Sequence, residues 1–400
     1  MQTLTATYRI VTPMFLGGAD PAAEAELRLS SFKGALRFWW RALMWGKVRD
    51  IMDLRHKESE LFGSSQLEHG QSKVIWAMES RPTAPLIAAG AILGADGQQA
   101  NRGSRAVGEG ARYLGYGLME IGGRLTRPCL PAPQEIRLRA CFRAEATPEQ
   151  RAQVEAAVRV LGLFGGLGSR SRRGYGSLTL RSLEVAGETQ WRSPATMEQW
   201  DDCLRETVGK AEGNGLPGWT AFSSGHSRLL LLSGDHETPL DLLARLGRDF
   251  VFYRSWGKNG RVLGSPGEEN FRDDHDLMRP KRVPNPRTHP RRVVFGLPHN
   301  YGKRPEEQVG PADPELDRRA SPLFFHIHQP SAETSPVGIL LFLPSRFLPR
   351  GRDAISVGGI HVPLAHGGDG SFWKPALDFL DRLSAGSGKE KFRAARLICL

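Results

Sequence analysis

The chain has 400 residues, 40% of them hydrophobic and 24% charged, which fits two or three globular domains and excludes a disordered or fibrous protein. Its longest apolar stretch, residues 337–343, is far shorter than the roughly 20 residues of a membrane-spanning helix. The N-terminus lacks the basic start and apolar core of an export signal. Four widely spaced cysteines give no zinc or disulfide pattern. We therefore expect a cytoplasmic, reduced protein that binds no metal and no cofactor.

Arginine dominates the charge of the chain. The 54 basic residues exceed the 43 acidic ones, giving a net charge of +11, and all but 11 of the basic residues are arginine. A guanidinium group binds phosphate oxygens two at a time and stacks on bases, so nucleic acid is the natural partner of such a surface. A generally arginine-rich proteome would give the same composition, and only clustering of the arginines separates the two interpretations.

The first half of the chain has the hydrophobic periodicity of a ferredoxin-like domain. Alternating apolar residues predict four strands, at 2–12, 73–79, 135–143 and 175–185. A helix is expected over 32–48, after a serine cap. Another is expected over 147–164, where Thr147 and Gln150 can form a capping box and Pro148 occupies the first helical position. The order strand, helix, two strands, helix, strand is typical of ferredoxin-like domains. Residues 82–123 have too weak a pattern for an assignment.

The second half repeats this order weakly. Two amphipathic helices are predicted, at 239–256 and 372–383, and a further helix at 197–210 lies in a connector. Four apolar segments predict strands, at 228–232, 293–297, 323–328 and 338–343. The proline-punctuated stretch 257–292 carries an acidic block followed by a basic one, which indicates an extended insertion.

The first predicted helix has a basic face. Phe32, Leu36, Trp39 and Leu43 form its apolar stripe, while the other face consists of Lys33, Arg37, Trp40, Arg41 and Met44. The basic face spans about 12 Å, the reach of two phosphates of an extended single strand, and Trp40 offers a surface for a base. The alternative is that these cations are merely solvated and that Trp40 joins Trp39 in the core.

The second cluster is the loop 165–177, GGLGSRSRRGYGS. Glycines allow backbone N–H groups to approach a phosphate, three arginines add charge, and the tyrosine can stack on a base. The glycines follow a helix and precede a strand, which excludes a Rossmann fingerprint. A flexible, solvated turn is the alternative. The predicted RNA-binding residues here are Gly166, Gly168, Ser169, Arg170, Ser171, Arg172, Arg173, Gly174 and Tyr175.

Three segments together, 12–20 (TPMFLGGAD), 31–41 (SFKGALRFWWR) and 166–176 (GLGSRSRRGYG), resemble the RAMP superfamily of CRISPR proteins. Within it they are similar to the first subunit of type III-B (Cmr) effector complexes, and residues 319–323 add to the likeness. The resemblance implies an α+β fold of two tandem ferredoxin-like (RRM-like) domains. We expect these at 1–190, containing the glycine-rich loop, and at 221–400, containing the basic insertion 257–292, with a connector at 191–220.

The resemblance also implies a function. In that family this subunit is a non-catalytic RNA-binding component, whose partners are CRISPR RNA, target RNA and the other Cmr subunits. Further RNA or partner contacts are expected at basic residues of the second half, namely Lys281, Arg282, Arg287, Arg291, Arg292 and Arg319.

The alternative function is a metal-independent RAMP endoribonuclease that processes CRISPR RNA with a histidine, for which His56, His69 and His326 are the candidates. The pair formed by His326 and His328 lacks evident third and fourth metal ligands. The binding hypothesis requires that the basic face of the first helix and the loop 165–177 meet in one groove.

Overall fold

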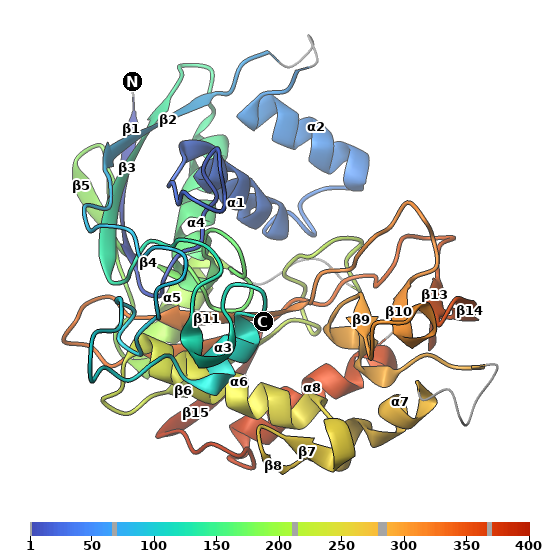
Figure 1. Ribbon diagram of the computed structural model, residues 1–400. Coiled ribbons are helices and arrows are strands. Elements are labelled where there is room, and N and C mark those ends of the chain that lie inside the picture. Colours follow the sequence, from blue (N-terminus) through green and yellow to red (C-terminus); the bar gives the residue numbers. More distant parts are fainter. Residues whose placement is uncertain (1, 66–69, 210–214, 279–285, 366–369) are drawn as a thin grey trace.

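A computed structural model describes residues 2–65, 70–209, 215–278, 286–365 and 370–400, and its two halves are coloured blue to green and yellow to red in Figure 1. The first half contains a five-stranded antiparallel sheet of order β2-β3-β1-β4-β5. Its strands are β1 (Thr3–Ile10), β2 (Val74–Ser80), β3 (Gln134–Phe142), β4 (Leu178–Val185) and β5 (Glu188–Arg192). The helices α1 (Leu29–Ala42) and α4 (Pro148–Phe164) cover one face of this sheet. The first four strands have the ferredoxin-like order.

The second half repeats this topology. Its four-stranded antiparallel sheet has the order β11-β12-β6-β15, with two helices inserted at the equivalent places in the chain. The elements are β6 (Arg228–Ser233), α6 (Pro239–Arg254), β11 (Leu323–His328), β12 (Val337–Phe342), α8 (Lys374–Ser384) and β15 (Ala394–Cys399). The predicted α+β fold with two ferredoxin-like units is thereby confirmed.

Smaller elements decorate both units. Helices α2 (Ile51–Phe62), α3 (Glu109–Leu114) and α5 (Met197–Thr207) belong to the first half of the chain, and α7 (Arg272–Leu277) to the second. A small sheet consists of β9 (His299–Asn300), β10 (Gln308–Pro311), β13 (Ala354–Val357) and β14 (Ile360–Pro363). A two-stranded ribbon pairs β7 (Arg261–Val262) with β8 (Ser265–Pro266). Within these described ranges, no helix is long and apolar enough to cross a membrane.

The two units share their hydrophobic cores. Leu229 and Leu231 of β6 pack in the cluster that contains α1 and α4, whereas Leu230 and Leu232 pack in the cluster that contains α6 and α8. The sheet of the second half is therefore covered on both faces, which explains why β6 is a continuous apolar run rather than an alternating one.

A seam joins the units where residues 172–179 run beside β11. The N–H of Phe325 donates to the carbonyl of Arg172 over 3.0 Å. Further along, the N–H of Ile327 donates to the Ser177 hydroxyl over 3.2 Å. The loop 165–177 is thus held between the two halves of the molecule.

Most predicted elements are confirmed, and the differences have physical reasons. The capping box of α4 is present. Helix α1 begins at Leu29 without a side-chain cap and ends at Ala42, so both predicted ends were wrong. Strand β4 begins at Leu178, because the preceding residues form the turn that fills the seam. Residues 293–297 were predicted as a strand, but a 3-10 turn occupies Arg291–Phe295.

Candidate nucleic-acid interface

Trp40 does not offer a stacking surface. It is 1% exposed, and its Nε1 donates to Gln153 Oε1 over 3.1 Å. The ring of Phe62, at the end of α2, packs edge-on against it with the centroids 5.6 Å apart. The predicted exposed face of Trp40 is therefore wrong, because helix α2, which the sequence analysis did not predict, covers it.

The cations of α1 are partly neutralised. Arg37 Nε and Arg41 Nη1 each lie 2.6 Å from the same oxygen of Glu58, whose side chain is 8% exposed. One carboxylate thus balances two guanidinium groups, and one positive charge remains. Lys33 is exposed on the same face. Gly34 is exposed on α1, and a side chain there would meet open space.

The loop 165–177 is held in one conformation by backbone hydrogen bonds to the segment that follows β1. The N–H of Ser169 donates to the Phe15 carbonyl (2.8 Å), and that of Gly176 donates to the Pro13 carbonyl (2.9 Å). Gly168 has a φ of +88°, and a side-chain carbon there would lie 2.5 Å from the Phe15 carbonyl oxygen.

The other glycines of the turn are also used within the chain. A side-chain carbon on Gly174 would lie 2.5 Å from a methyl carbon of Leu243, and one on Gly166 would lie 2.7 Å from the Gly176 carbonyl oxygen. These glycines therefore serve the close packing of the turn, and contact of their amides with a phosphate stays a prediction.

The arginines of the loop differ in exposure. Arg170 is exposed, and its Nε donates to the Tyr116 carbonyl over 2.9 Å. Arg172 is half-buried, with its guanidinium 5.0 Å from the Phe38 ring and 4.5 Å from the Phe324 ring. Its Nη1 donates to the Ser321 carbonyl over 2.9 Å. Arg172 thus connects the loop, α1 and β11.

The helix and the loop do meet, on a different side of α1 from the one predicted. The hollow between α1 and the loop has a volume of about 130 Å³. A larger hollow, of about 410 Å³, lies in the second half of the chain and is separate from it. The lining of the α1–loop hollow includes Ala35, Phe38, Gly165, Gly166, Ser171 and Arg172. Arg37 and Arg41 are absent from this lining, since they turn toward Glu58 on α2.

Arg173 and Tyr175 point into the protein. Tyr175 is fully buried, and its hydroxyl donates to the Ala111 carbonyl over 2.9 Å, so the predicted stacking of a base on this ring is wrong. The guanidinium of Arg173 lies 5.1 Å from the Phe250 ring and 5.6 Å from the Phe325 ring. Burial lowers the pKa of Arg173 to about 9, so the group remains charged at neutral pH.

Of the candidate arginines of the second half, Arg292 and Arg319 are half-buried and Arg291 is exposed. The backbone N–H groups of Arg291 and Arg292 each donate to the buried Asp274 over 2.8 Å. Arg319 Nη2 donates to the Ser345 hydroxyl over 2.7 Å. Arg287 is exposed. Lys281 and Arg282 lie outside the described residues.

Four arginines near the seam have no carboxylate partner. Several other half-buried arginines have one, as in the pairs Arg159–Glu155 and Arg382–Glu268 and in Arg245 Nη1 with Glu237 Oε1 at 2.6 Å, although Arg9, Arg143, Arg151 and Arg292 also have none among the described residues. Among the residues that the structure describes, no acidic oxygen lies within 4.0 Å of the basic nitrogens of four arginines, which we call the unpaired arginines: Arg172, Arg173, Arg254 and Arg319.

The unpaired arginines also influence one another. Burial and, to a smaller extent, the positive charge of Arg319 lower the pKa of Arg172 to about 10. Burial likewise lowers the pKa of Arg173, with a second contribution from Arg254. Like charges gathered without a counter-charge are costly inside a protein, and an anion is what would relieve the cost.

The histidines do not form a metal site. His326 and His328 are each 1% exposed on β11, and burial lowers the pKa of both, so they are neutral. His328 Nε2 lies 3.0 Å from the Pro194 carbonyl oxygen. The described ranges contain no group of three or more His, Cys, Asp or Glu residues placed to hold a metal ion. His56 is exposed on α2, and His69 lies outside the described residues.

Sequence reasoning missed several contributors. Phe38 and Phe324, which stack on Arg172, read as ordinary apolar residues. Arg254 reads as a favourable cation in the last turn of a helix. Glu58 had no signal without the prediction of α2.

Comparison with known proteins identifies the first part of the chain. Residues 7–179 match the RAMP superfamily. The resemblance predicted from the motifs is thereby confirmed for this RAMP segment, which contains α1 and the whole loop 165–177. A stretch of 57 residues is 40% identical to CRISPR system Cmr subunit Cmr1-2 of Pyrococcus furiosus. That stretch covers 14% of this chain and 30% of the relative.

Solved structures extend the likeness beyond the RAMP segment. The crystal structure of Cmr1 from Pyrococcus furiosus in its apo form matches 94% of this chain and 97% of its own chain, with a TM-score of 0.55 and 19% identity. This match shows that both halves share the fold of that protein. A chain of the type III-B Cmr-beta complex bound to cognate target RNA matches 86% of this chain and 94% of its own, with 11% identity and a TM-score of 0.47.

Proposed function

We propose that the protein is an RNA-binding subunit of a type III-B CRISPR (Cmr) ribonucleoprotein in the cytoplasm. It would bind single-stranded CRISPR RNA, target RNA or both, beside the other Cmr subunits, and would aid target capture in antiviral defence. The observation that carries the proposal is the set of unpaired arginines beside the α1–loop hollow. The superfamily match of residues 7–179 and the local identity to a Cmr1 protein support the same conclusion.

A single strand could be bound at the hollow and on the exposed cations outside it. Lys33 on α1 and Arg170 on the loop do not line the hollow, but both are exposed and can contact the phosphates of a strand that runs past it. In the hollow itself, Phe38 is partly exposed beside the Arg172 guanidinium. An aromatic ring with a stacked guanidinium is a surface on which a base can pack. The backbone of Gly34 lies open at the edge of this surface, so a strand can approach the helix closely.

Binding is favoured over catalysis. A histidine acting as general acid or base must reach its substrate with a suitable pKa. His326 is buried, and burial holds its pKa well below the usual range. The ribonuclease alternative would therefore depend on His56 or His69. Labelled RNA incubated with the purified protein in EDTA is expected to stay intact, and cleavage that a change of His56 abolishes would favour the alternative.

The test of RNA binding uses exposed residues, so that folding is unaffected. We expect the double variant Lys33→Gln, Arg170→Gln to bind a labelled single-stranded RNA more weakly at about 50 mM salt and to lower the salt slope by about 1.4, since each phosphate contact contributes about 0.7 on single strands. The matched control is Arg205→Gln, Arg192→Gln, which removes two exposed cations that do not line the hollow. Equal losses in both double variants would contradict the proposal.

A further inference from the structure

A second basic cluster lies where α6 ends. Arg254, the last residue of α6, donates from Nη1 to the Tyr113 hydroxyl over 2.6 Å, and its Nη2 lies 3.2 Å from His299 Nε2. Arg292 Nη1 donates to the Arg254 carbonyl over 3.4 Å. Arg173 approaches from the loop and shares the Phe250 ring with Arg254, at 5.1 Å and 5.4 Å from the ring centroid. We call Arg173, Arg254, Arg292 and His299 the arginine cluster.

The tautomer of His299 follows from its neighbour. A guanidinium group is a donor only, so His299 Nε2 must accept the hydrogen bond from Arg254, and Nδ1 must carry the ring proton. Burial and the nearby arginines lower the pKa of His299 well below its usual range, which keeps the ring neutral in this state. His299 Nδ1 is therefore an N–H donor.

Three donors of the cluster have no acceptor. Arg173 Nη1, Arg254 Nε and His299 Nδ1 are buried, and no hydrogen-bond partner for them exists in the described part of the chain. Buried polar groups without partners are uncommon and costly, at about 1–3 kcal/mol each and more for charged groups. All three atoms are donors, so the missing group is an acceptor.

The missing acceptor also has to be negative. The only acidic side chain that binds the cluster is Asp274 among the described residues, and it is committed to the backbone N–H groups of Arg291 and Arg292. The aromatic faces of Phe250, Phe295 and Phe325 stabilise the guanidinium groups of Arg173 and Arg254 but do not accept their N–H groups in the plane. Two like charges therefore face one another without an anion.

We propose that the arginine cluster is a phosphate-binding site. A phosphate group has several strong acceptor oxygens and a charge that two guanidinium groups match. Arg173, Arg254, Arg292 and His299 are each half-buried, although the three donor atoms without partners are themselves buried. The phosphate can belong to a free ion or nucleotide, or to the RNA strand of the neighbouring hollow. The inference stands without the proposed function, because an isolated phosphate would occupy the same donors.

The experiment measures thermal unfolding of the full chain in inorganic phosphate at constant ionic strength, with chloride as the replaced anion. We expect phosphate to raise the melting temperature of the wild type. The variant Arg254→Met should remain folded, since it exchanges an unpaired half-buried cation for an apolar chain of similar length. The phosphate concentration that gives half of the stabilisation should rise at least tenfold in this variant. The matched control Arg205→Met, on the exposed side of α5, should keep the full response.

RNA binding by the same variants identifies the source of the phosphate. If Arg254→Met weakens RNA binding as well as the phosphate response, the strand supplies the phosphate. If only the phosphate response falls, the site takes a free phosphate or nucleotide, and the proposal holds in that form. A wild type that gains no stability from phosphate, or an Arg254→Met protein that keeps the whole response, would overturn it. The Lys33 and Arg170 variants test the proposed function without touching this cluster.

Discussion

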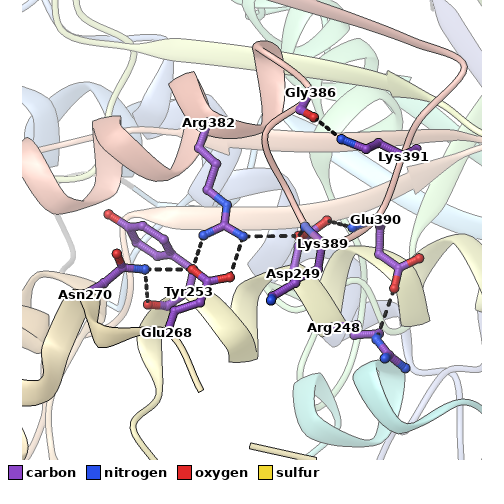
Figure 2. Close-up of polar contacts among 10 residues, drawn as sticks. All are labelled: Arg248, Asp249, Tyr253, Glu268, Asn270, Arg382, Gly386, Lys389, Glu390 and Lys391. Carbon is purple, nitrogen blue, oxygen red and sulfur yellow. Dashed lines mark hydrogen bonds and ion pairs between the residues drawn. The ribbon is translucent and has the colours of Figure 1, made fainter. Parts of the chain in front are cut away.

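The two ferredoxin-like units each place a glycine-rich basic loop between their second helix and their last strand, and the two loops differ in what they hold. The loop 165–177 carries the unpaired Arg172 and Arg173, and its glycines pack against the protein. The loop 386–391 surrounds a carboxylate instead, that of Asp249 on α6 (Figure 2). Asp249 is fully buried and accepts the N–H groups of Lys389 and Glu390, at 2.5 Å and 3.3 Å.

The second loop is thus satisfied within the chain. Arg382 forms a forked pair with Glu268 and lies 3.8 Å from Asp249 (Figure 2). Arg248 Nε lies 3.1 Å from Glu390 Oε1 on the outer side. A side-chain carbon on Gly388 would lie 2.7 Å from Asp249 Oδ1, which explains the glycine there. The comparison teaches that a basic glycine-rich loop marks an anion site only where the protein does not itself supply the anion.

The largest expected effect is the loss of stability when the buried Trp40 ring of the first unit is removed. Trp40→Ala should lower the free energy of unfolding by about 3–5 kcal/mol, because a large buried ring is removed from a packed core. Urea denaturation measures this loss, and Ile121→Ala, which removes a 97% exposed side chain, is the control with little effect. If Trp40→Ala were as stable as the wild type but bound RNA more weakly, this would contradict the core role of Trp40 and support the stacking of a base on its ring.

Removing the internal anion of the second loop should have the next largest effect. Asp249→Ala leaves two buried N–H groups and part of Arg382 without their partner, at a cost of about 2–4 kcal/mol in unfolding free energy. Glu390→Gln keeps the loop backbone bonds and is the matched control. An Asp249→Ala protein as stable as the wild type would show that the carboxylate does not hold the loop.

Asp249 should also make the free energy of unfolding depend on pH. Burial raises the pKa of Asp249 to about 6, so the folded protein binds this proton more tightly than the unfolded chain does. Protonation of Asp249 therefore adds roughly 2–3 kcal/mol to the free energy of unfolding at a pH below about 4, the pKa of the carboxyl in the unfolded chain. This contribution is lost as the pH rises through about 6. Asp249→Asn should lack this loss when unfolding is measured from pH 4 to 7, and an unchanged pH profile would exclude Asp249 as its source.

The smallest effect should separate binding from stability in the first unit. Gly34→Ala adds a methyl group that meets open space and should raise the unfolding free energy by up to about 1 kcal/mol, since alanine favours a helix over glycine. The same methyl group would stand where a strand approaches, so RNA affinity should fall. A gain in stability with unchanged affinity would move the strand away from the centre of α1.

Much of the fold could be predicted from local patterns. Strands β1, β2 and β3 alternate visibly, and α4 carries its own capping signals. Strand β15 and the small strands β9, β10, β13 and β14 were not predicted, because their short segments gain order from pairing with distant residues rather than from their own periodicity. Helix α2 is too polar for a strong pattern, and its omission made the Trp40 face look free.

The candidate site was predicted in outline only. Charge and glycine content pointed to α1 and the loop 165–177, and the structure brings them together. Which arginines are free could not be predicted, since Arg37 and Arg41 look like Arg172 in sequence and differ only in having Glu58 as a neighbour. Tertiary pairing of charges is not encoded in local spacing.

The most direct test of the account is the salt dependence of RNA binding by Arg172→Met, measured beside the wild type on one single-stranded RNA. Arg172 has no carboxylate to lose, so the variant should stay folded by circular dichroism. We expect its slope of log affinity against log salt to fall by about 0.7, the contribution of one phosphate contact, together with weaker binding at low salt. A folded variant with the slope and affinity of the wild type would contradict the claim that the unpaired arginines bind RNA.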